Sequence, residues 1–276
     1  MTSTNPTNAQ RRDAARAQAQ ALRARQEASE RRIRVVTFGV LALAVIALVV
    51  IAVLLFVRAH RDDAANAVED LPLSQVADVP STARADGAIP VGADRSAGGE
   101  AAEGVPEVAI VVDYMCPYCA DFERVNKDAI EGFLADGTAD VVVRPISMLD
   151  GASQGAAYST RAASASAWVA DRDPAHWLDF HEALFVDQPA EGSPGLTDDE
   201  LARRATAVGV PADVADAIAS GQARRTFGQW VASASAAASA DPAFRGTPTI
   251  TIDGQRWEGA WTDPTALPQA VADASR

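Results

Sequence analysis

The chain has 276 residues, of which 48% are hydrophobic, and a formal net charge of −13 at pH 7. Residues 1–34 hold eight arginines against three acidic residues, so the rest of the chain carries a charge of about −18. This acidity argues against nucleic acid or an anionic lipid surface as the partner of the region after residue 34.

The first predicted element is formed by residues 35–57, 23 residues without a charge that are dominated by Val, Leu, Ala and Ile. A helix of this length would extend about 35 Å, which is enough to cross a membrane. By the positive-inside rule, the arginine-rich residues 1–34 would stay in the cytoplasm and everything after residue 57 would lie outside. A cleaved signal peptide is the alternative, but the apolar run is too long for one. We therefore expect a single-pass anchor in the cell membrane, and we assign no activity to the tail.

A linker and a folded domain are expected after this anchor. Residues 58–84 are rich in Ala, Asp, Pro and Ser and lack sustained periodicity, which predicts a flexible linker. Residues 85–276 are then left for one domain of ordinary size. Within it, residues 88–91 predict a short strand at the edge of a sheet, because Pro90 would not suit a central strand.

Both cysteines of the chain lie in one motif, Cys116-Pro117-Tyr118-Cys119. Because proline is favoured at the first helical position, Pro117 marks a helix start and makes Cys116 the N-cap. Unpaired backbone N–H groups and the helix dipole then favour the thiolate of Cys116. Cys119 lies on the same face of the helix and within disulfide reach, which predicts an exposed nucleophile, Cys116, and a resolving thiol, Cys119. The motif stands between a predicted strand over residues 108–112 and a predicted helix over residues 118–134.

Two other uses of a Cys-x-x-Cys pair are half of a zinc site and inert packing in a core. A structural zinc site needs four ligands, and only His60, His176 and His181 are left as histidine candidates. No second cysteine pair exists, so redox chemistry is favoured over both alternatives and no metal site is expected.

The remaining elements alternate between strand-like and helix-like patterns. Residues 140–146 follow a glycine break and are rich in β-branched side chains, which predicts a strand parallel to the one before the motif. Four Ala-rich helices are predicted next, separated by Pro, Gly and acidic residues, and a hairpin around Asp253-Gly254 and a last helix follow. The helices cover residues 152–170, 175–187, 197–208 and 212–238; the hairpin strands cover 247–252 and 256–257; the last helix covers 264–274.

This order of elements, with Cys116-Pro117-Tyr118-Cys119 early and Gly246-Thr247-Pro248-Thr249 before a terminal hairpin and helix, resembles the thioredoxin fold. The helices at about residues 150–240 look like the insertion of the DsbA-like subfamily. Asp113-Tyr114-x-Cys116-Pro117-x-Cys119 is similar to its bacterial membrane-anchored members. The resemblance covers roughly residues 85–276 and implies an α/β thioredoxin-like fold with a helical insertion, preceded by one transmembrane helix.

The resemblance also implies a substrate edge. Pro248 would be preceded by a cis peptide bond and would lie against the cysteine pair, exposing the backbone of Thr247 to an extended substrate strand. The alternative is an ordinary proline at the first residue of a strand.

The chain departs from the family where many thioredoxin-like proteins carry a buried acid six residues before the first cysteine, because Ile110 stands there. Asp113 is the nearest substitute as a proton acceptor, although satisfying backbone N–H groups at the strand end suits it better. Glu123 is expected on the helix surface. His176, His181 and Glu182 fit an amphipathic surface helix rather than a metal site, and Trp257 and Trp261 fit core packing rather than a peptide groove.

These features predict a thiol-disulfide oxidoreductase outside the cytoplasmic membrane, without a cofactor, that donates the Cys116–Cys119 disulfide to exported proteins with free thiols. Family likeness suggests a quinone-linked membrane protein of the DsbB or vitamin-K-epoxide-reductase type as the partner that reoxidises it. The reverse direction, as a disulfide reductase or isomerase, stays open because Pro-Tyr does not fix the redox potential. A membrane-tethered binding module, with cysteines that are vestigial or bind a soft metal such as copper, is the alternative from another class.

Overall fold

The computed structural model of this protein describes residues 47–51, 53, 68–100 and 104–276. Residues 47–51 and 53 are helical and belong to a unit separate from that of residues 65–276. The predicted tail, most of the predicted membrane span over residues 35–57, and residues 58–67 of the predicted linker lie outside the described residues. Within the described part of the chain, no helix combines the length and the apolar character needed to cross a bilayer.

The domain is built on a five-stranded mixed sheet in the order β1-β3-β2-β4-β5. Strands β2 and β3 are parallel, as predicted, and the other pairs are antiparallel. Pro90 lies in the edge strand β1, opposite Val142, which confirms the predicted edge position. The strands are β1 (Ile89–Val91), β2 (Glu107–Val112), β3 (Asp140–Pro145), β4 (Thr249–Ile252) and β5 (Gln255–Arg256).

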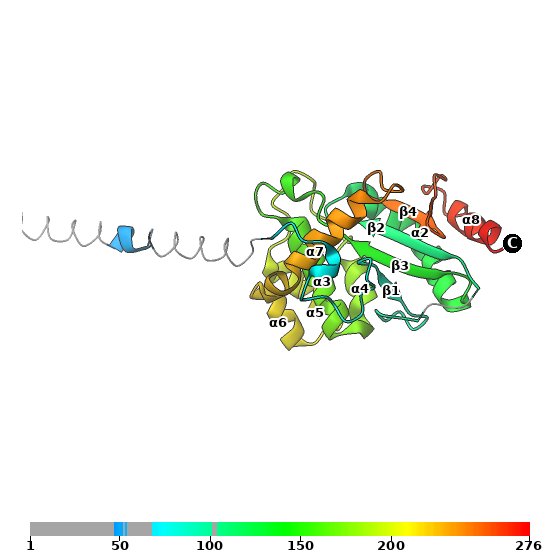
Figure 1. The fold of residues 1–276 in the computed structure, drawn as a ribbon. Helices are drawn as coiled ribbons and strands as arrows, with labels where there is room; N and C mark the ends of the chain where they lie inside the picture. Colours follow the sequence, from blue (N-terminus) through cyan, green and yellow to red (C-terminus); the bar gives the residue numbers. More distant parts are fainter. Residues whose placement is uncertain (1–46, 52, 54–67, 101–103) are drawn as a thin grey trace, which may run out of the picture. The chain divides into compact units, whose positions relative to one another are not determined.

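The two faces of the sheet are covered by different helices. On one face, alternate strand residues such as Ile110, Val143 and Ile250 belong to the main core together with Phe122 of α2 (Pro117–Asp136) and Leu267 of α8 (Ala266–Ala274). On the other face, Val111 forms a smaller cluster with Ile146 and Ala238. Figure 1 shows β3, β2 and β4 side by side in the sheet, with α8 near β4. The alternation follows from the two-residue period of a strand, which turns successive side chains to opposite faces.

The region between β3 and β4 is helical, as predicted, but three of the predicted boundaries are wrong. The first helix begins at Tyr158 rather than residue 152, after a short 3₁₀ turn. The second ends at Ala183 rather than residue 187. The predicted helix over 212–238 is broken at Gly221, whose φ of 74° is left-handed and suits glycine. The helical elements here are η2 (Asp150–Ala152), α3 (Tyr158–Arg172), η3 (Pro174–His176), α4 (Trp177–Ala183), α5 (Asp198–Ala207), α6 (Ala212–Ala219) and α7 (Gln222–Ala240).

The segment before β1 is bound to the domain, which corrects the prediction of a flexible linker over residues 58–84 for its described part. A short 3₁₀ helix, η1 (Leu73–Gln75), packs Leu73 against the core. The backbone N–H of Glu69 donates to Gln229 of α7 at 2.6 Å, and Gln229 donates back to the Glu69 carbonyl at 2.8 Å. Thr82 donates to the carbonyl of Ala170 at the end of α3. The composition of residues 58–84 could not predict these contacts, because the partners lie far along the chain.

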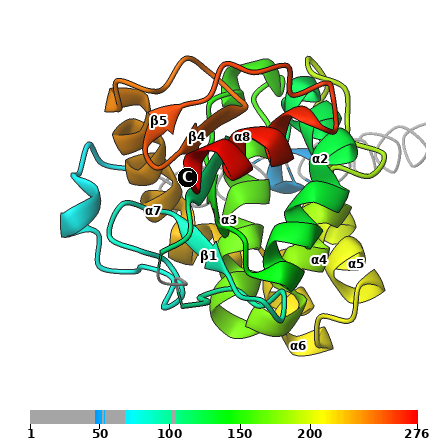
Figure 2. The ribbon, with the colours of Figure 1, turned by 90° about the vertical axis from the view of Figure 1, so that its right-hand side faces the viewer.

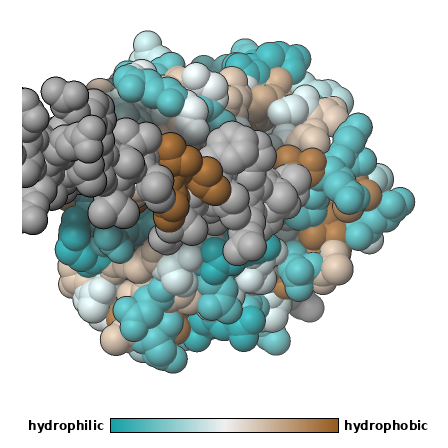
Figure 3. Space-filling view, turned by 90° about the vertical axis from the view of Figure 1, so that its left-hand side faces the viewer, coloured by the Kyte–Doolittle hydropathy of each residue, from teal (hydrophilic) through white to brown (hydrophobic). Residues whose placement is uncertain are grey.

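Hydrophobic side chains are scattered on the surface of the described domain. On the face drawn in Figure 3, teal and white residues cover most of the surface and brown residues form small patches. Scattered exposed hydrophobic residues are normal for a globular protein and carry no argument by themselves.

Figure 2 shows the domain from another side, with α8 in front of the sheet and α2 beside α4.

Candidate active site

The cysteine motif lies where β2 passes into α2, as the sequence predicts. Cys116 is the N-cap of α2 with an extended backbone, and Pro117 occupies the first turn. Cys116 is only 4% exposed and Cys119 is fully buried, so the prediction of an exposed nucleophile is wrong. Tyr118, between them, is exposed.

The two thiols have opposite acidities. The pKa of Cys116 is lowered to about 6, chiefly because the side chain of Cys119 hydrogen-bonds to its sulfur. The Thr247 side chain and the backbone N–H groups of Cys119 and Tyr118 act in the same direction, while burial opposes them. Burial, followed by the neighbouring Cys116 sulfur, raises the pKa of Cys119 well above its ordinary range. The site therefore holds one stabilised thiolate beside one thiol that keeps its proton.

The loop before β4 closes the other side of Cys116. The Thr247-Pro248 peptide bond is cis, as the resemblance implied. The Sγ of Cys116 donates to the carbonyl oxygen of Thr247 at 3.1 Å, which joins residues 131 positions apart. The carbonyl of Thr247, one of the two predicted substrate-binding residues, is thus in direct contact with the predicted nucleophile.

Asp113 is fully buried at the end of β2 and satisfies donors from three segments. Its carboxylate accepts from the backbone N–H groups of Met115 and Leu149 at 2.8 Å each and from the Ser159 hydroxyl at 2.7 Å. Burial raises the pKa of Asp113 in spite of these bonds. The carboxylate fastens the segments that follow β2 and β3 to the start of α3, which is the strand-end role expected for it.

Two contacts from the helical insertion reach the motif and were missed from the sequence. The Nε2 of Gln188, in the segment after α4, donates to the carbonyl of Tyr114 at 2.9 Å and to that of Cys116 at 3.0 Å. Gln188 has no local sequence signal, because its partners lie more than 70 positions away.

The expectation that Glu123 and His181 lie on helix surfaces is wrong. Glu123 is 9% exposed and His181 is 1% exposed, and they face each other with 3.1 Å between His181 Nε2 and Glu123 Oε1. Glu123 follows Cys119 by four residues and so shares its buried helix face. His181 stands four residues after Trp177, on the apolar face of α4, and this spacing was the available signal.

The other residues considered as metal ligands or groove residues have structural roles. His176 bonds to Asp173 at 2.8 Å, and Glu182 forms ion pairs with Lys127 and Arg95. No group of three or more ligand side chains that could hold a metal ion occurs among residues 47–51, 53, 68–100 and 104–276. Two tryptophans near the hairpin, Trp257 and Trp261, are partly buried against the core, in line with the packing role expected for them.

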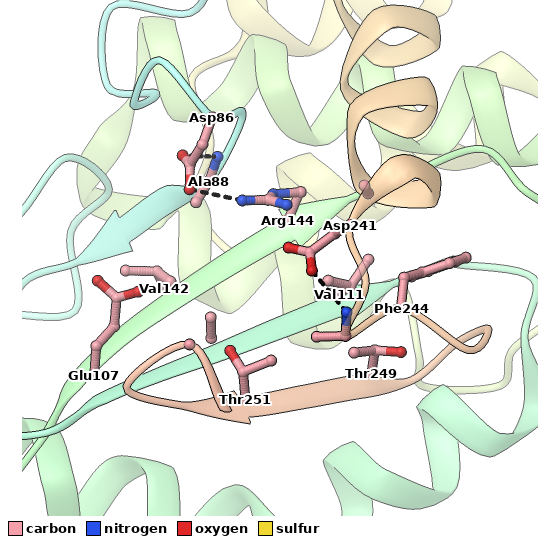
Figure 4. A pocket seen from close by; sticks show the side chains of 14 residues that line it. Asp86, Ala88, Glu107, Val111, Val142, Arg144, Asp241, Phe244, Thr249 and Thr251 are labelled. Atoms are coloured by element: carbon pink, nitrogen blue, oxygen red, sulfur yellow. Dashed lines mark hydrogen bonds and ion pairs between the residues drawn. The ribbon is translucent and has the colours of Figure 1, made fainter. Parts of the chain in front are cut away.

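Two hollows of the described domain differ in their position relative to the cysteines. One, of about 370 Å³, lies between α2 and the residues that follow α4, with Ala120, Glu123 and Val186 in its lining, so that it adjoins the motif helix. The other, of about 130 Å³, lies on the second face of the sheet and contains neither cysteine. Figure 4 shows Arg144 and Asp86 of this hollow turned toward each other, and they are bonded at 2.6 Å.

Comparison with known proteins agrees with this geometry. A family model described as thioredoxin matches residues 91–269. The chain belongs to the thioredoxin family. The reduced disulfide bond oxidoreductase DsbG of Mycobacterium tuberculosis is 30% identical, with a TM-score of 0.52 over 61% of this chain and 77% of DsbG. Oxidised DsbA of the same organism is 29% identical, with a TM-score of 0.56 over 68% of this chain and 92% of DsbA.

A shorter stretch of this thioredoxin-family chain is similar to a much longer protein. It is 37% identical over 111 residues to the serine/threonine-protein kinase PknE of Mycobacterium tuberculosis, covering 39% of this chain and 20% of the kinase. The chain thus spans about a fifth of the length of the curated relatives it matches. The fold, the motif and the structural relatives of this chain are similar to those of DsbA-like thiol-disulfide oxidoreductases.

Proposed function

We propose that this oxidoreductase donates its Cys116–Cys119 disulfide to exported proteins. The observation that supports this direction is the lowered pKa of Cys116, about 6, beside the raised pKa of Cys119. A reduced form that holds a stabilised thiolate is favoured over the disulfide, and such a pair is a stronger oxidant.

The reaction takes two exchange steps. A substrate thiolate attacks the Sγ of Cys116, the Cys116–Cys119 bond breaks, and Cys119 leaves and takes up a proton. A second substrate thiolate then attacks the substrate sulfur of the mixed disulfide, and Cys116 leaves as its stabilised thiolate. Two substrate thiols lose two electrons to the cysteine pair, which ends reduced, and the substrate gains a disulfide.

Thr247 supplies the edge along which the substrate lies. Its carbonyl oxygen lies 3.1 Å from the Sγ of Cys116, which can donate to it only while it keeps its proton. With a pKa of about 6, Cys116 is mostly a thiolate at neutral pH, so this carbonyl oxygen is then free to accept a backbone N–H of an extended substrate.

The place of the reaction follows from the sequence rather than from the described residues. Residues 35–57 would anchor the protein in the cell membrane with residues 1–34 in the cytoplasm and the domain outside. Each donated disulfide leaves the pair reduced, so turnover needs an oxidant. A membrane protein of the DsbB or vitamin-K-epoxide-reductase type would supply it by accepting the two electrons.

A trapping experiment tests this proposal. A Cys119→Ala variant keeps the Cys116 thiolate, which can attack a disulfide of an exported protein and form a mixed disulfide while releasing the other substrate thiolate. It lacks the Cys119 thiol that would attack Cys116 and reverse this step, so mixed disulfides with exported proteins should accumulate. Cys116→Ser is the matched control and should trap none. If cells lacking any redundant oxidase form their exported disulfides normally with the Cys116→Ser variant, disulfide donation is not the function of this protein.

A further inference from the structure

A chain of buried polar side chains runs behind the motif and joins three helices. Tyr114, two residues before Cys116, bonds to Ser166 of α3 at 2.7 Å and to His181 of α4 at 2.8 Å. Trp177 of α4 also bonds to Ser166, at 3.0 Å, and His181 bonds to Glu123 of α2 at 3.1 Å. None of the five side chains is more than 9% exposed, with Glu123 the most accessible. Buried groups of this kind must satisfy one another, so the position of each proton can be deduced.

The donors fix the protonation of the histidine. The indole N–H of Trp177 and the hydroxyl of Tyr114 both donate to Ser166 Oγ, which has two lone pairs to accept them. Tyr114 has no second proton, so its contact with His181 Nδ1 needs a hydrogen on Nδ1. A neutral ring of that form would turn the bare lone pair of Nε2 toward Glu123 Oε1, and an ionised carboxylate there would repel it.

We propose that His181 carries a proton on Nδ1 and that a second proton is shared between His181 Nε2 and Glu123 Oε1. The pair is thus a buried proton-holding site. It acts as a positioning pair for the redox motif, because the proton on Nδ1 is the one that holds the Tyr114 side chain.

The charged side chains around Glu123 and His181 form ion pairs with one another rather than with this pair. The Nζ of Lys127 on α2 lies 2.5 Å from Oε2 of Glu182 on α4, and Glu182 also bonds to Arg95. Arg95 further binds Glu131 of α2 and Asp179 of α4. Lys127, Glu182 and Arg95 therefore already have partners of opposite charge, and Glu123 and His181 neutralise one another.

The effect reaches the nucleophile through the backbone. The side chain of Tyr114 is held by His181, while its carbonyl oxygen and that of Cys116 are held by the same Gln188 amide. Loss of the shared proton would place a carboxylate against a bare nitrogen and displace Tyr114, and with it the backbone that carries Cys116. A misplacement of about 1 Å at a reacting group costs on the order of 100-fold in rate.

Nitrogen NMR of the full chain tests the proton assignment directly. In the wild-type protein at neutral pH we expect a proton on His181 Nδ1. In Glu123→Gln, the amide can donate to Nε2, so the ring should stay in the neutral form with Nδ1 protonated, without the shared proton. His176, which is partly exposed, serves as the internal reference ring. A wild-type His181 with a bare Nδ1 and a protonated Nε2 would overturn the assignment.

The rate of exchange between Cys116 and glutathione tests the positioning role of the pair. This role rests on the proposed function in one respect, that the cysteine motif is the reacting group. Glu123→Gln should react at nearly the wild-type rate, whereas Glu123→Leu, which leaves Nε2 without a partner, should lose up to about 100-fold. Equal rates for the two variants would overturn the role. Neither readout depends on which way electrons flow in the cell, so failure here is distinct from failure of disulfide donation.

Discussion

The stability of the reduced protein should depend on pH between about 6 and 8.5, and that of the disulfide form should not share this dependence. The folded reduced form has a Cys116 pKa of about 6, whereas an unfolded cysteine titrates near about 8.5. Because the pKa is depressed by folding, the stabilisation is fully present above the unfolded value and is lost as pH falls through the folded value. It amounts to about 1.4 kcal/mol at pH 7 and about 3 kcal/mol at pH 8.5.

Cys119 sets the upper end of this window. Its pKa is raised by burial, so its contribution is present below the unfolded value and is lost as pH rises above it. The free energy of unfolding of the reduced protein should therefore rise from pH 6 to 8.5 and stop rising beyond that.

Urea unfolding of the reduced and oxidised proteins at matched pH values measures the effect. Subtracting the two curves of unfolding free energy against pH removes the contributions of titrating groups that both forms share. Cys116→Ser is the control and should have no such slope. Ultraviolet absorbance of the thiolate gives the folded pKa independently. A flat difference curve between pH 6 and 8.5, or a thiolate midpoint near the unfolded value, would refute the electrostatic account of the site.

Three further substitutions test single contacts of the site. Gln188→Ala removes two hydrogen bonds to the motif backbone and should lower the free energy of unfolding in urea by about 1–2 kcal/mol. Its control is Gln269→Ala, at an exposed position of α8, which should change the free energy of unfolding by less than about 0.5 kcal/mol. Equal effects of the two substitutions would contradict the Gln188 contact. Asp113→Asn turns an amide N–H₂ toward a buried donor and should cost about 1–3 kcal/mol by the same assay, so unchanged stability would exclude its fastening role. Thr247→Ala removes the side chain that favours the Cys116 thiolate and should raise the thiolate midpoint above the wild-type value; a midpoint that stays at the wild-type value would contradict that contribution.

The features that the sequence predicted well are those whose causes lie within a few residues. Pro117 at the first helical turn and Cys116 at the N-cap follow from local backbone rules, and the structure places both as expected. Pro90 on an edge strand follows from the missing N–H of proline. The cis bond before Pro248 came only from the family resemblance, because X-Pro bonds are mostly trans and no local rule selects the isomer.

The features that were missed depend on partners far along the chain. Glu123 and His181 are 58 positions apart, and each alone looks like an ordinary surface residue of an amphipathic helix. Gln188 meets Cys116 across 72 positions, and Gln229 holds Glu69 across 160. Tertiary contacts therefore decide whether a polar residue is buried, and whether a Pro- and Ser-rich segment is bound to the domain, where composition alone predicts exposure and flexibility.

The central claim, donation of the Cys116–Cys119 disulfide, is tested most directly by the redox potential of the full chain in equilibrium with glutathione. A donor should be more oxidising than about −200 mV, toward the value of about −120 mV for DsbA. The lowered pKa of Cys116 predicts this result, because the reduced form is the stabilised one. A potential near that of thioredoxin, about −270 mV, would contradict the account and assign the protein to disulfide reduction.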